Sequence, residues 1–382
     1  MILGGEKRMI SFGTNDILLE FGTDIILSGI SFSVNEGERL GIVGVNGAGK
    51  SSLMRIIAGL QKPTSGSVYT QKGATLGMLA QNEMLDSGLS VFDEMLGAFP
   101  VLCALERSLA DMSLEIERRA SLPHDSEYEK LISRYTEAEE RFRAEGGYEY
   151  RSKISSTLAK FGFDESRRDT LVKTLSGGER TRLALVRLLL SEPDILLLDE
   201  PTSQLDPIAA ADFISTLRKL NRELGITVIA AEHRLEEIFP VADKVMVMDG
   251  GKLVAFDIPE RIGTLLPEDH PIKKALPSAT RIALSLGKKG DLPLTVRDGK
   301  TYLEENFGKA EKPLEIKEYT HSDEKAIELK NVWFRYEKDL PDILRGLTFS
   351  VYKGEIFSVL GGNGVGKTTA LNVISGLAKA YR

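Results

Sequence analysis

A sequence of 382 residues with 42% hydrophobic and 27% charged residues has an ordinary globular composition and is long enough for two domains. No segment approaches the roughly 18 consecutive apolar residues of a membrane-spanning helix, and we expect no signal peptide at the N-terminus. The net charge of −7 excludes a general attraction to nucleic acid or anionic lipid. The single cysteine, Cys103, excludes an internal disulfide and is typical of a reducing cytosol.

The sequence repeats itself once. Residues 25–51 and 343–368 each predict an alternating strand, a glycine-containing turn, a second apolar strand and a glycine-rich loop. A helical run with a glycine near its end follows each loop, so two copies of one unit begin in this chain. We expect only the first copy to be finished.

Both glycine-rich loops match the phosphate-binding pattern between a strand and a helix. Their glycines allow a tight turn whose N–H groups face a phosphate, and the lysine neutralises the phosphate charge. In the first copy the expected nucleotide-binding residues are Gly44, Asn46, Gly47, Gly49, Lys50, Ser51 and Ser52. In the second copy they are Gly361, Asn363, Gly364, Gly366, Lys367, Thr368 and Thr369.

Residues 101–150 predict a helical hairpin. Apolar residues recur at helical spacing from Leu105 to Ile116 and again from Leu131 to Phe142, with a turn between them. The hairpin contains 12 acidic and 7 basic residues. Two alternatives fit this pattern: a solvated pair of helices packed on each other, or a projecting arm that contacts a partner.

The rest of the first copy predicts an α/β fold. Apolar runs at 196–198 and 228–231 predict buried parallel strands, residues 212–224 predict a helix, and 245–248 with 253–255 predict a hairpin. Strands that alternate with helices favour a mostly parallel sheet.

Two acidic residues, Asp199 and Glu200, follow the first of these strands, where ligand sites of α/β proteins form. The aspartate is suited to hold Mg²⁺, and the glutamate can polarise an attacking water.

Residues 175–202, LSGGERTRLALVRLLLSEPDILLLDEPT, resemble the signature and Walker B segments of ATP-binding cassette (ABC) ATPases. The resemblance covers nearly the whole chain. It implies an ABC-type P-loop NTPase domain with a mostly parallel sheet, an antiparallel β subdomain and a helical arm, followed by a partial second cassette. It also implies Mg²⁺-dependent hydrolysis of ATP to ADP and phosphate.

The resemblance implies roles for individual residues. Glu200 would be the catalytic carboxylate, His233 would contact the γ-phosphate, and Gln81 would sense Mg²⁺ and the attacking water. The implied metal ligands are Ser51, Gln81, Asp199 and Thr368. Phe21 would stack on adenine, unless it is an ordinary core aromatic, and Tyr336 takes its place in the second copy.

The signature residues would act across a dimer. In the family they cap the γ-phosphate held by an opposing cassette, and here they are Ser176, Gly177, Gly178 and Glu179. Asp206 would belong to the loop that couples the two sites. Because the second copy stops before a Walker B segment of its own, we expect hydrolysis to need two chains whose first cassettes pair head to tail.

The two ends of the chain resemble different ABC classes. Up to Thr202, the arm, the run GGYEYRSKISSTLAKFGF and the run GERTRLALVRLLL resemble the ABC-F class of ribosome-acting ATPases. From Ser203, the runs SQLDPIAAADF, AAEHRLEEI, MDGGKLVAFDIPERI, LPLTVRDGK and AIELKNVWFRY resemble the duplicated ATPase of energy-coupling-factor importers. The interpretations are an ATPase component of an ABC transporter, which we favour, an ABC-F-type translation factor, or a chimeric fragment that retains only ATPase chemistry.

The expected domains are a first ABC ATPase domain over 1–258, a linker or small subdomain over 259–325, and the truncated start of a second ABC domain over 326–382. The expected cofactors are ATP and Mg²⁺. The expected partners are a second ABC cassette, from a homodimer or a related subunit, and either membrane transport subunits or the ribosome. We expect a cytoplasmic protein, or one that is peripheral at the inner face of the cell membrane.

Overall fold

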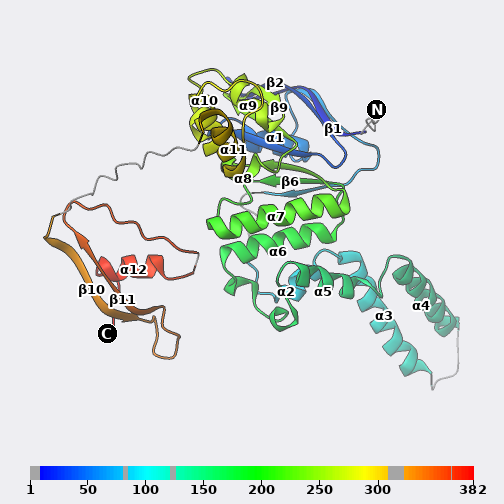
Figure 1. The fold of residues 1–382 in the computed structure, drawn as a ribbon. Helices are drawn as coiled ribbons and strands as arrows, with labels where there is room; N and C mark the ends of the chain where they lie inside the picture. The colour runs from blue at the N-terminus through cyan, green and yellow to red at the C-terminus, as the bar shows by residue number, and fades with distance from the viewer. Residues whose placement is uncertain (1–8, 81–84, 121–125, 309–321, 363) are drawn as a thin grey trace. The chain divides into compact units, whose positions relative to one another are not determined.

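The computed structural model describes residues 9–80, 85–120, 126–308, 322–362 and 364–382 (Figure 1). The chain divides into two compact units. The first consists of Met1–Gln204 with Ala211–Tyr302, and the second of Leu205–Ala210 with Leu303–Arg382. Among the described residues, no helix is both long and apolar enough to cross a membrane.

A six-stranded sheet forms the centre of the first unit, in the order β5-β6-β7-β3-β8-β9. Its neighbours pair in parallel except for the antiparallel hairpin β8–β9. The strands are β3 (Arg39–Gly44), β5 (Leu76–Leu79), β6 (Ile195–Asp199), β7 (Thr227–Ala231), β8 (Lys244–Asp249) and β9 (Lys252–Asp257). Every residue of β6 and β7 is buried, which explains their continuous apolar runs. The predicted strands and hairpin are confirmed.

A second, antiparallel sheet lies over the first, in the order β2-β1-β4. Its strands are β1 (Ile10–Phe21), β2 (Asp24–Asn35) and β4 (Ser65–Thr70). Helix α1 (Lys50–Ile57) shares one buried cluster with both sheets, including Leu53, Met54 and Ile56 from the helix. This core fixes the start of α1 against the ends of the central strands.

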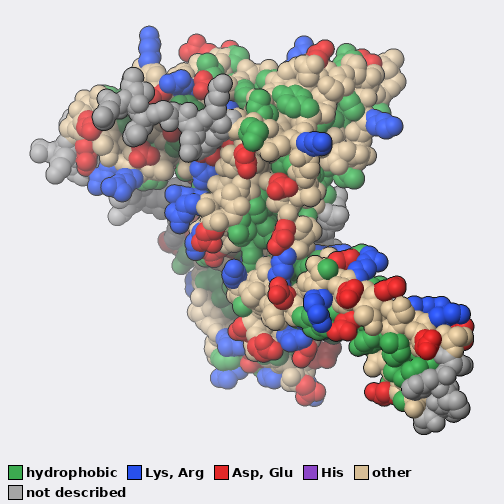
Figure 2. Space-filling view, turned by 90° about the vertical axis from the view of Figure 1, so that its right-hand side faces the viewer, with side chains coloured by type: hydrophobic (Ala, Val, Ile, Leu, Met, Phe, Trp, Pro, Cys, Tyr) green, Lys and Arg blue, Asp and Glu red, His purple; other side chains and the backbone are tan. Residues whose placement is uncertain are grey.

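The predicted helical hairpin is present and extends away from the central sheet (Figure 1). It consists of α3 (Pro100–Arg119) and α4 (Ser126–Ala144), which contact each other, and most of the predicted turn lies outside the described residues. One side chain of each helix is buried, Leu102 and Phe142. Acidic and basic side chains are intermingled on the face drawn in Figure 2.

Four further helices occur among the described residues before β7, and the first turn of the last of them, residues 207–210, is grouped with the second unit. They are α2 (Val91–Leu96), α5 (Tyr150–Lys160), α6 (Gly177–Leu190) and α7 (Pro207–Leu224), with short 3₁₀ turns η1 (Glu165–Arg167) and η2 (Val172–Thr174). Helix α7 begins five residues before the predicted start at residue 212. The reason is its cap: the Asp206 carboxylate accepts the N–H groups of Ile208 and Ala209, and Pro207 suits the first helical position.

The weak pattern after residue 259 is a set of short helices. After α8 (Leu235–Ile238) and the β8–β9 hairpin come α9 (Pro259–Leu265), η3 (Pro271–Ala275), α10 (Ser278–Ser285) and α11 (Val296–Phe307). Ile262, Leu276 and Leu292 are buried here, and the first unit continues to Tyr302. The sequence pattern therefore weakens within this unit rather than at the boundary that we expected at 258.

The second unit contains an antiparallel pair, β10 (Lys325–Phe334) and β11 (Leu344–Tyr352), and helix α12 (Lys367–Ile374). The second apolar strand predicted for this copy does not form, and Ile356 and Leu360 are 94% and 88% exposed. In the first copy the equivalent strand β3 pairs on both sides, with β7 and β8. The described residues of the second unit form only the β10–β11 sheet, so the run has no such partners.

Candidate functional site

The loop between β3 and α1 has the backbone that its glycines predict. Gly47 and Gly49 have φ angles of 81° and 93°, in the left-handed region, and Gly49 is the N-cap of α1. A Cβ atom on Gly49 would lie 2.6 Å from Cδ2 of Leu27. Glycine is therefore required at this position by both conformation and space.

Lys50, the first residue of α1, is only 5% exposed. Its Nζ donates hydrogen bonds to the carbonyl oxygens of Gly44 at 3.0 Å and Val45 at 3.3 Å. Burial lowers the pKa of Lys50, and the negative charges of Glu200 and Asp199 act against that decrease. The ammonium group therefore lies in the electrostatic field of both carboxylates.

Ser51 and Asp199 come together from different elements, the start of α1 and the end of β6. The Ser51 hydroxyl donates to Oδ1 of Asp199 at 3.2 Å, and Asp199 is 4% exposed. Burial raises the pKa of Asp199, and the bond from Ser51 opposes this. A hydroxyl and one carboxylate are a donor set that fits Mg²⁺ bound together with phosphate oxygens. No cluster of three metal-binding side chains occurs in the described part of the chain.

Glu200 and His233 meet because β6 and β7 are neighbours in parallel. Asp199 pairs with Ala231, and the Glu200 N–H donates to the Ala231 carbonyl at 2.9 Å. His233 Nε2 lies 2.5 Å from Oε1 of Glu200. Glu200 has a φ angle of 51°, uncommon for a residue with a side chain.

Glu232 is a buried residue that the sequence analysis missed. It is 3% exposed, and its carboxylate accepts the Thr202 N–H at 3.1 Å and the Thr202 hydroxyl at 2.9 Å. Burial raises the pKa of Glu232 to about 7, although the bonds from Thr202 lower it. The available signal was an acidic residue directly after the apolar run 228–231.

The signature residues form a group of their own at the start of α6. Ser176 is the N-cap, and it forms a reciprocal capping box with Glu179. The Ser176 hydroxyl donates to Oε2 of Glu179 at 2.8 Å, and Arg167 binds the other carboxylate oxygen. Gly177 and Gly178 make the first turn, so the predicted position of this motif at a helix N-terminus is present.

Three further residues that the sequence analysis assigned to the nucleotide site lie outside the groups described so far. Phe21 ends β1 and is 60% exposed, so it is not a core aromatic. Asp206 caps α7 and belongs to the second unit. Gln81 lies outside the described residues.

The second copy repeats the lysine geometry of the first. Nζ of Lys367 donates to the carbonyl oxygens of Gly361 at 2.7 Å and of its neighbour Gly362 at 2.6 Å. Gly364 and Gly366 have φ angles of 82° and 95°, and Thr368 lies in the first turn of α12. The Tyr336 hydroxyl is 3.3 Å from that of Thr369, and Tyr336 is 59% exposed. Asn363 lies outside the described residues.

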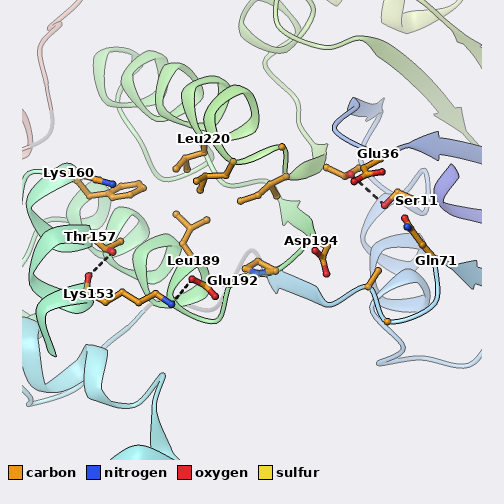
Figure 3. A pocket seen from close by; sticks show the side chains of 18 of the residues that line it. Ser11, Glu36, Gln71, Lys153, Thr157, Lys160, Leu189, Glu192, Asp194 and Leu220 are labelled. Atoms are coloured by element: carbon orange, nitrogen blue, oxygen red, sulfur yellow. Dashed lines mark hydrogen bonds and ion pairs between the residues drawn. The ribbon is translucent and has the colours of Figure 1, made fainter. Parts of the chain in front are cut away.

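A large cavity occurs elsewhere in the first unit. Its volume is about 740 Å³, and its lining includes Lys153, Glu192, Asp194 and Thr227. Figure 3 shows Lys153 and Glu192 pointing toward each other at one side of it. Asp194 and Thr227 lie at the beginnings of β6 and β7, whereas the phosphate-loop residues face the strand ends. This cavity is therefore separate from the candidate site.

Comparison with known proteins gives a family match in both copies. The sequence model described as "ABC transporter" matches residues 27–203 and 344–382, more than half of the chain. A Bacillus thuringiensis protein provisionally named an ABC transporter ATP-binding protein is 38% identical over 233 residues, which are 60% of this chain and 41% of that protein. The energy-dependent translational throttle protein EttA of Mycobacterium tuberculosis is 28% identical over 93% of this chain and 64% of its own length.

Among solved structures, that of CbiO1 from Clostridium perfringens, described as part of the ABC transporter complex cbiONQ, is 22% identical. It covers 77% of this chain and 99% of its own, with a TM-score of 0.49. The chain spans about half the length of the curated relatives that it matches, from 41% to 64% for the two described above.

Replacement of Lys50 by alanine is expected to weaken nucleotide binding, because it removes the charge next to the phosphate loop. Hydrogen bonds to charged groups contribute about 1.5–3 kcal/mol, so the dissociation constant should rise roughly 10- to 100-fold. Equilibrium titration with a fluorescent ATP analogue measures this change. Lys72→Ala, at an exposed lysine, is the control. An unchanged dissociation constant for Lys50→Ala would refute the role of the lysine.

Glu232 should make the stability of the first unit depend on pH. Its pKa is about 7 in the folded protein against 4.5 for the free side chain, so the folded state binds more protons between these values. The free energy of unfolding should therefore fall by about 3 kcal/mol as the pH rises from 4.5 through 7. Urea unfolding at pH 5, 6, 7 and 8 should show that Glu232→Gln lacks this decrease. The exposed Glu36→Gln should retain it, and identical pH profiles for all three proteins would contradict the assignment.

Proposed function

Because the chain belongs to the ABC transporter family of ATP-binding cassettes, we propose that its first unit binds ATP with Mg²⁺ and hydrolyses it to ADP and phosphate. The observation that supports this proposal is a convergence of side chains. Lys50 and Ser51, at the start of α1, interact with Asp199 at the end of β6, and Glu200 and His233 contact each other just after β6 and β7.

Binding of the triphosphate falls to the loop and the start of α1. Its glycines place backbone N–H groups at the helix N-terminus, and Lys50 supplies a charge that can exchange its carbonyl partners for phosphate oxygens. Ser51 and Asp199 would hold Mg²⁺, which when bound neutralises charge on the phosphate oxygens. Phe21 is exposed, as a side chain that stacks on adenine must be.

Hydrolysis requires a base that orients water toward the γ-phosphate. Glu200 follows the strand that carries Asp199, so its carboxylate is positioned by the same strand as the metal ligand. His233 Nε2 contacts Oε1 of this carboxylate, and the carboxylate is the group that we propose accepts a proton from water. The proposed role of His233 is to orient Glu200 and to contact the γ-phosphate.

The signature residues would act on a nucleotide held by another cassette. Ser176 to Gly178 open α6, and N–H groups at a helix start bind anions. Arg167 and Glu179 hold the Ser176 turn in place. The proposed partner is a second ABC cassette, from another copy of the chain or from a related subunit.

The Glu200→Gln variant tests the proposed base. It should bind ATP with nearly unchanged affinity and release phosphate about 10²-fold more slowly, because the amide cannot accept the proton. A phosphate-release assay at saturating ATP measures the rate. Glu223→Gln, at an exposed position of α7, should hydrolyse ATP at the wild-type rate. Turnover by Glu200→Gln at the wild-type rate would end the assignment.

For the biological role we propose the ATPase component of an ABC transporter, cytoplasmic or peripheral at the inner face of the membrane. The support is the family model itself and the transporter-type names of similar proteins, such as that of Bacillus thuringiensis. An importer of the energy-coupling-factor type is the finer form of this proposal, and it rests on the sequence runs after Ser203.

The arm favours a second candidate, an ABC-F-type factor that acts on the ribosome. It projects from the central sheet, and EttA of Mycobacterium tuberculosis, named as a translational throttle protein, matches 93% of the chain. Many charges of the arm pair within their own helix, including Arg119 with Glu115 and Lys130 with Glu127. Ribosome contact would therefore depend on a few strongly exposed basic side chains more than on a broad basic face. One is Arg118, whose side chain is 78% exposed although it lies 3.9 Å from Glu115.

Shortening the arm separates these roles. Residues 108–138 can be replaced by a short glycine–serine loop that keeps Leu102 and Phe142, the buried residues at the arm's base. A transporter component should keep its ATPase rate and its binding to membrane subunits, without ribosome association before or after the change. Co-sedimentation with ribosomes that is lost on shortening, at unchanged ATPase rate, would instead establish the ABC-F role.

A further inference from the structure

We infer that Glu232 is a positioning residue of the ATPase site, whose carboxylate fixes the segment after Glu200 and so keeps the Glu200 side chain directed at His233. The inference rests on the proposed role of Glu200 as the base. It assigns a function to a buried acidic residue that has no part in binding ATP or Mg²⁺ in the mechanism above.

Glu200 needs external restraint because its backbone is strained. A residue with a side chain at a φ angle of 51° lies in a sparsely populated region, and such conformations persist when surrounding contacts determine them. On the N-terminal side the restraint is strand β6, every residue of which is buried. The Glu200 N–H also donates to the Ala231 carbonyl at 2.9 Å.

On the C-terminal side the restraint is the contact between Thr202 and Glu232. The two Thr202 donors, N–H and hydroxyl, bind separate oxygens of one carboxylate at 3.1 and 2.9 Å. Thr202 is 1% exposed and Glu232 is 3% exposed, so water does not compete for these bonds. Glu200 is thus held between a strand and a buried double hydrogen bond two residues later.

Three consecutive residues, the last of β7 and the two that follow it, make three connected contacts. The carbonyl of Ala231 binds the Glu200 N–H, the carboxylate of Glu232 binds Thr202, and the ring of His233 binds the Glu200 carboxylate. The Glu232 N–H donates to the carbonyl of Ile42 in β3 at 3.0 Å. The strand that leads into the phosphate loop and the segment that carries the base are therefore joined through Glu232.

The two donors of Thr202 match the two oxygens of the Glu232 carboxyl group. Glutamate presents two acceptor oxygens to the two donors, whereas glutamine keeps one acceptor and can bind the Thr202 hydroxyl only through its NH₂ group, with the direction of that hydrogen bond reversed. Burial of this carboxyl opposes its ionisation and raises its pKa, so the site retains an acidic residue in an unfavourable environment. A residue needed only to fill space could be apolar there.

The test compares variants on both sides of the contact. Thr202→Val removes the hydroxyl and keeps the shape and the N–H, Glu232→Gln removes one acceptor, and Thr202→Ser retains both donors. We expect kcat to fall about tenfold or more in Thr202→Val and in Glu232→Gln, because small displacements of a catalytic group have effects of this size. The affinity for a fluorescent ATP analogue should change less than twofold, and Thr202→Ser should restore kcat to within threefold of wild type.

The double variant Thr202→Val/Glu232→Gln and a control complete the design. The double variant should lose little more activity than either single variant, because all three disrupt one contact. Thr280→Val removes another fully buried hydroxyl. Thr280 lies in α10, and its hydroxyl donates to the Pro293 carbonyl at 2.7 Å. It should lower the melting temperature and leave kcat unchanged. If Glu232→Gln does not fold, Thr202→Val tests the same contact.

Glu200→Gln, assayed in the same series, distinguishes the proposed role of Glu200 as the base from the positioning role of Glu232. Wild-type turnover in Glu200→Gln would overturn both the proposed base and the positioning role. Slow turnover in Glu200→Gln with wild-type kcat in Thr202→Val and Glu232→Gln would overturn the positioning role alone. A loss of ATP affinity in these two variants equal to their loss of kcat would also overturn it, because it would indicate a general structural defect.

Discussion

Parallel pairing of β6 with β7 is the constraint on which the candidate site depends. The register aligns Asp199 with Ala231, so the residues that follow each strand emerge side by side at one edge of the sheet. Glu200 and His233 contact each other for this reason, although 33 residues separate them in the sequence. Strand β3, the other neighbour of β7, delivers the phosphate loop and Lys50 to the same edge. The parallel pairing of β6, β7 and β3 therefore brings charged residues from three segments of the chain to one edge of the sheet.

The site concentrates features that are unfavourable for folding. Lys50, Asp199 and Glu232 are ionisable and buried. Burial lowers the pKa of Lys50 and raises the pKa values of Asp199 and Glu232, so it favours the neutral form of each side chain. Glu200 adds a strained backbone angle. The surrounding core offsets these costs, because both sheets and α1 share one apolar cluster. A rigid, preorganised arrangement of charge is what the proposed transfer of a phosphoryl group to water would require.

The two copies show how far local sequence controls local structure. In both, the lysine of the glycine-rich loop donates to two carbonyl oxygens of its own loop, and a glycine with left-handed φ caps the following helix. The apolar run before the loop behaves differently. It is the buried strand β3 in the first copy and exposed, irregular chain in the second. Loop conformation is thus a local property, whereas a central strand exists only with neighbours on either side.

The sequence by itself determined the family, the α/β class, the glycine-rich loops and the helical arm, because each rests on glycine positions, apolar periodicity or a contiguous motif. It also placed Asp199 and Glu200 at a strand end. The tertiary structure decided what depends on contacts between distant segments: the bond of Ser51 to Asp199, that of His233 to Glu200, and the buried role of Glu232. A single acidic residue after an apolar run does not reveal its hydrogen-bond partner. Thr202 lies 30 residues before Glu232 in the sequence and reaches it only when β6 and β7 pair.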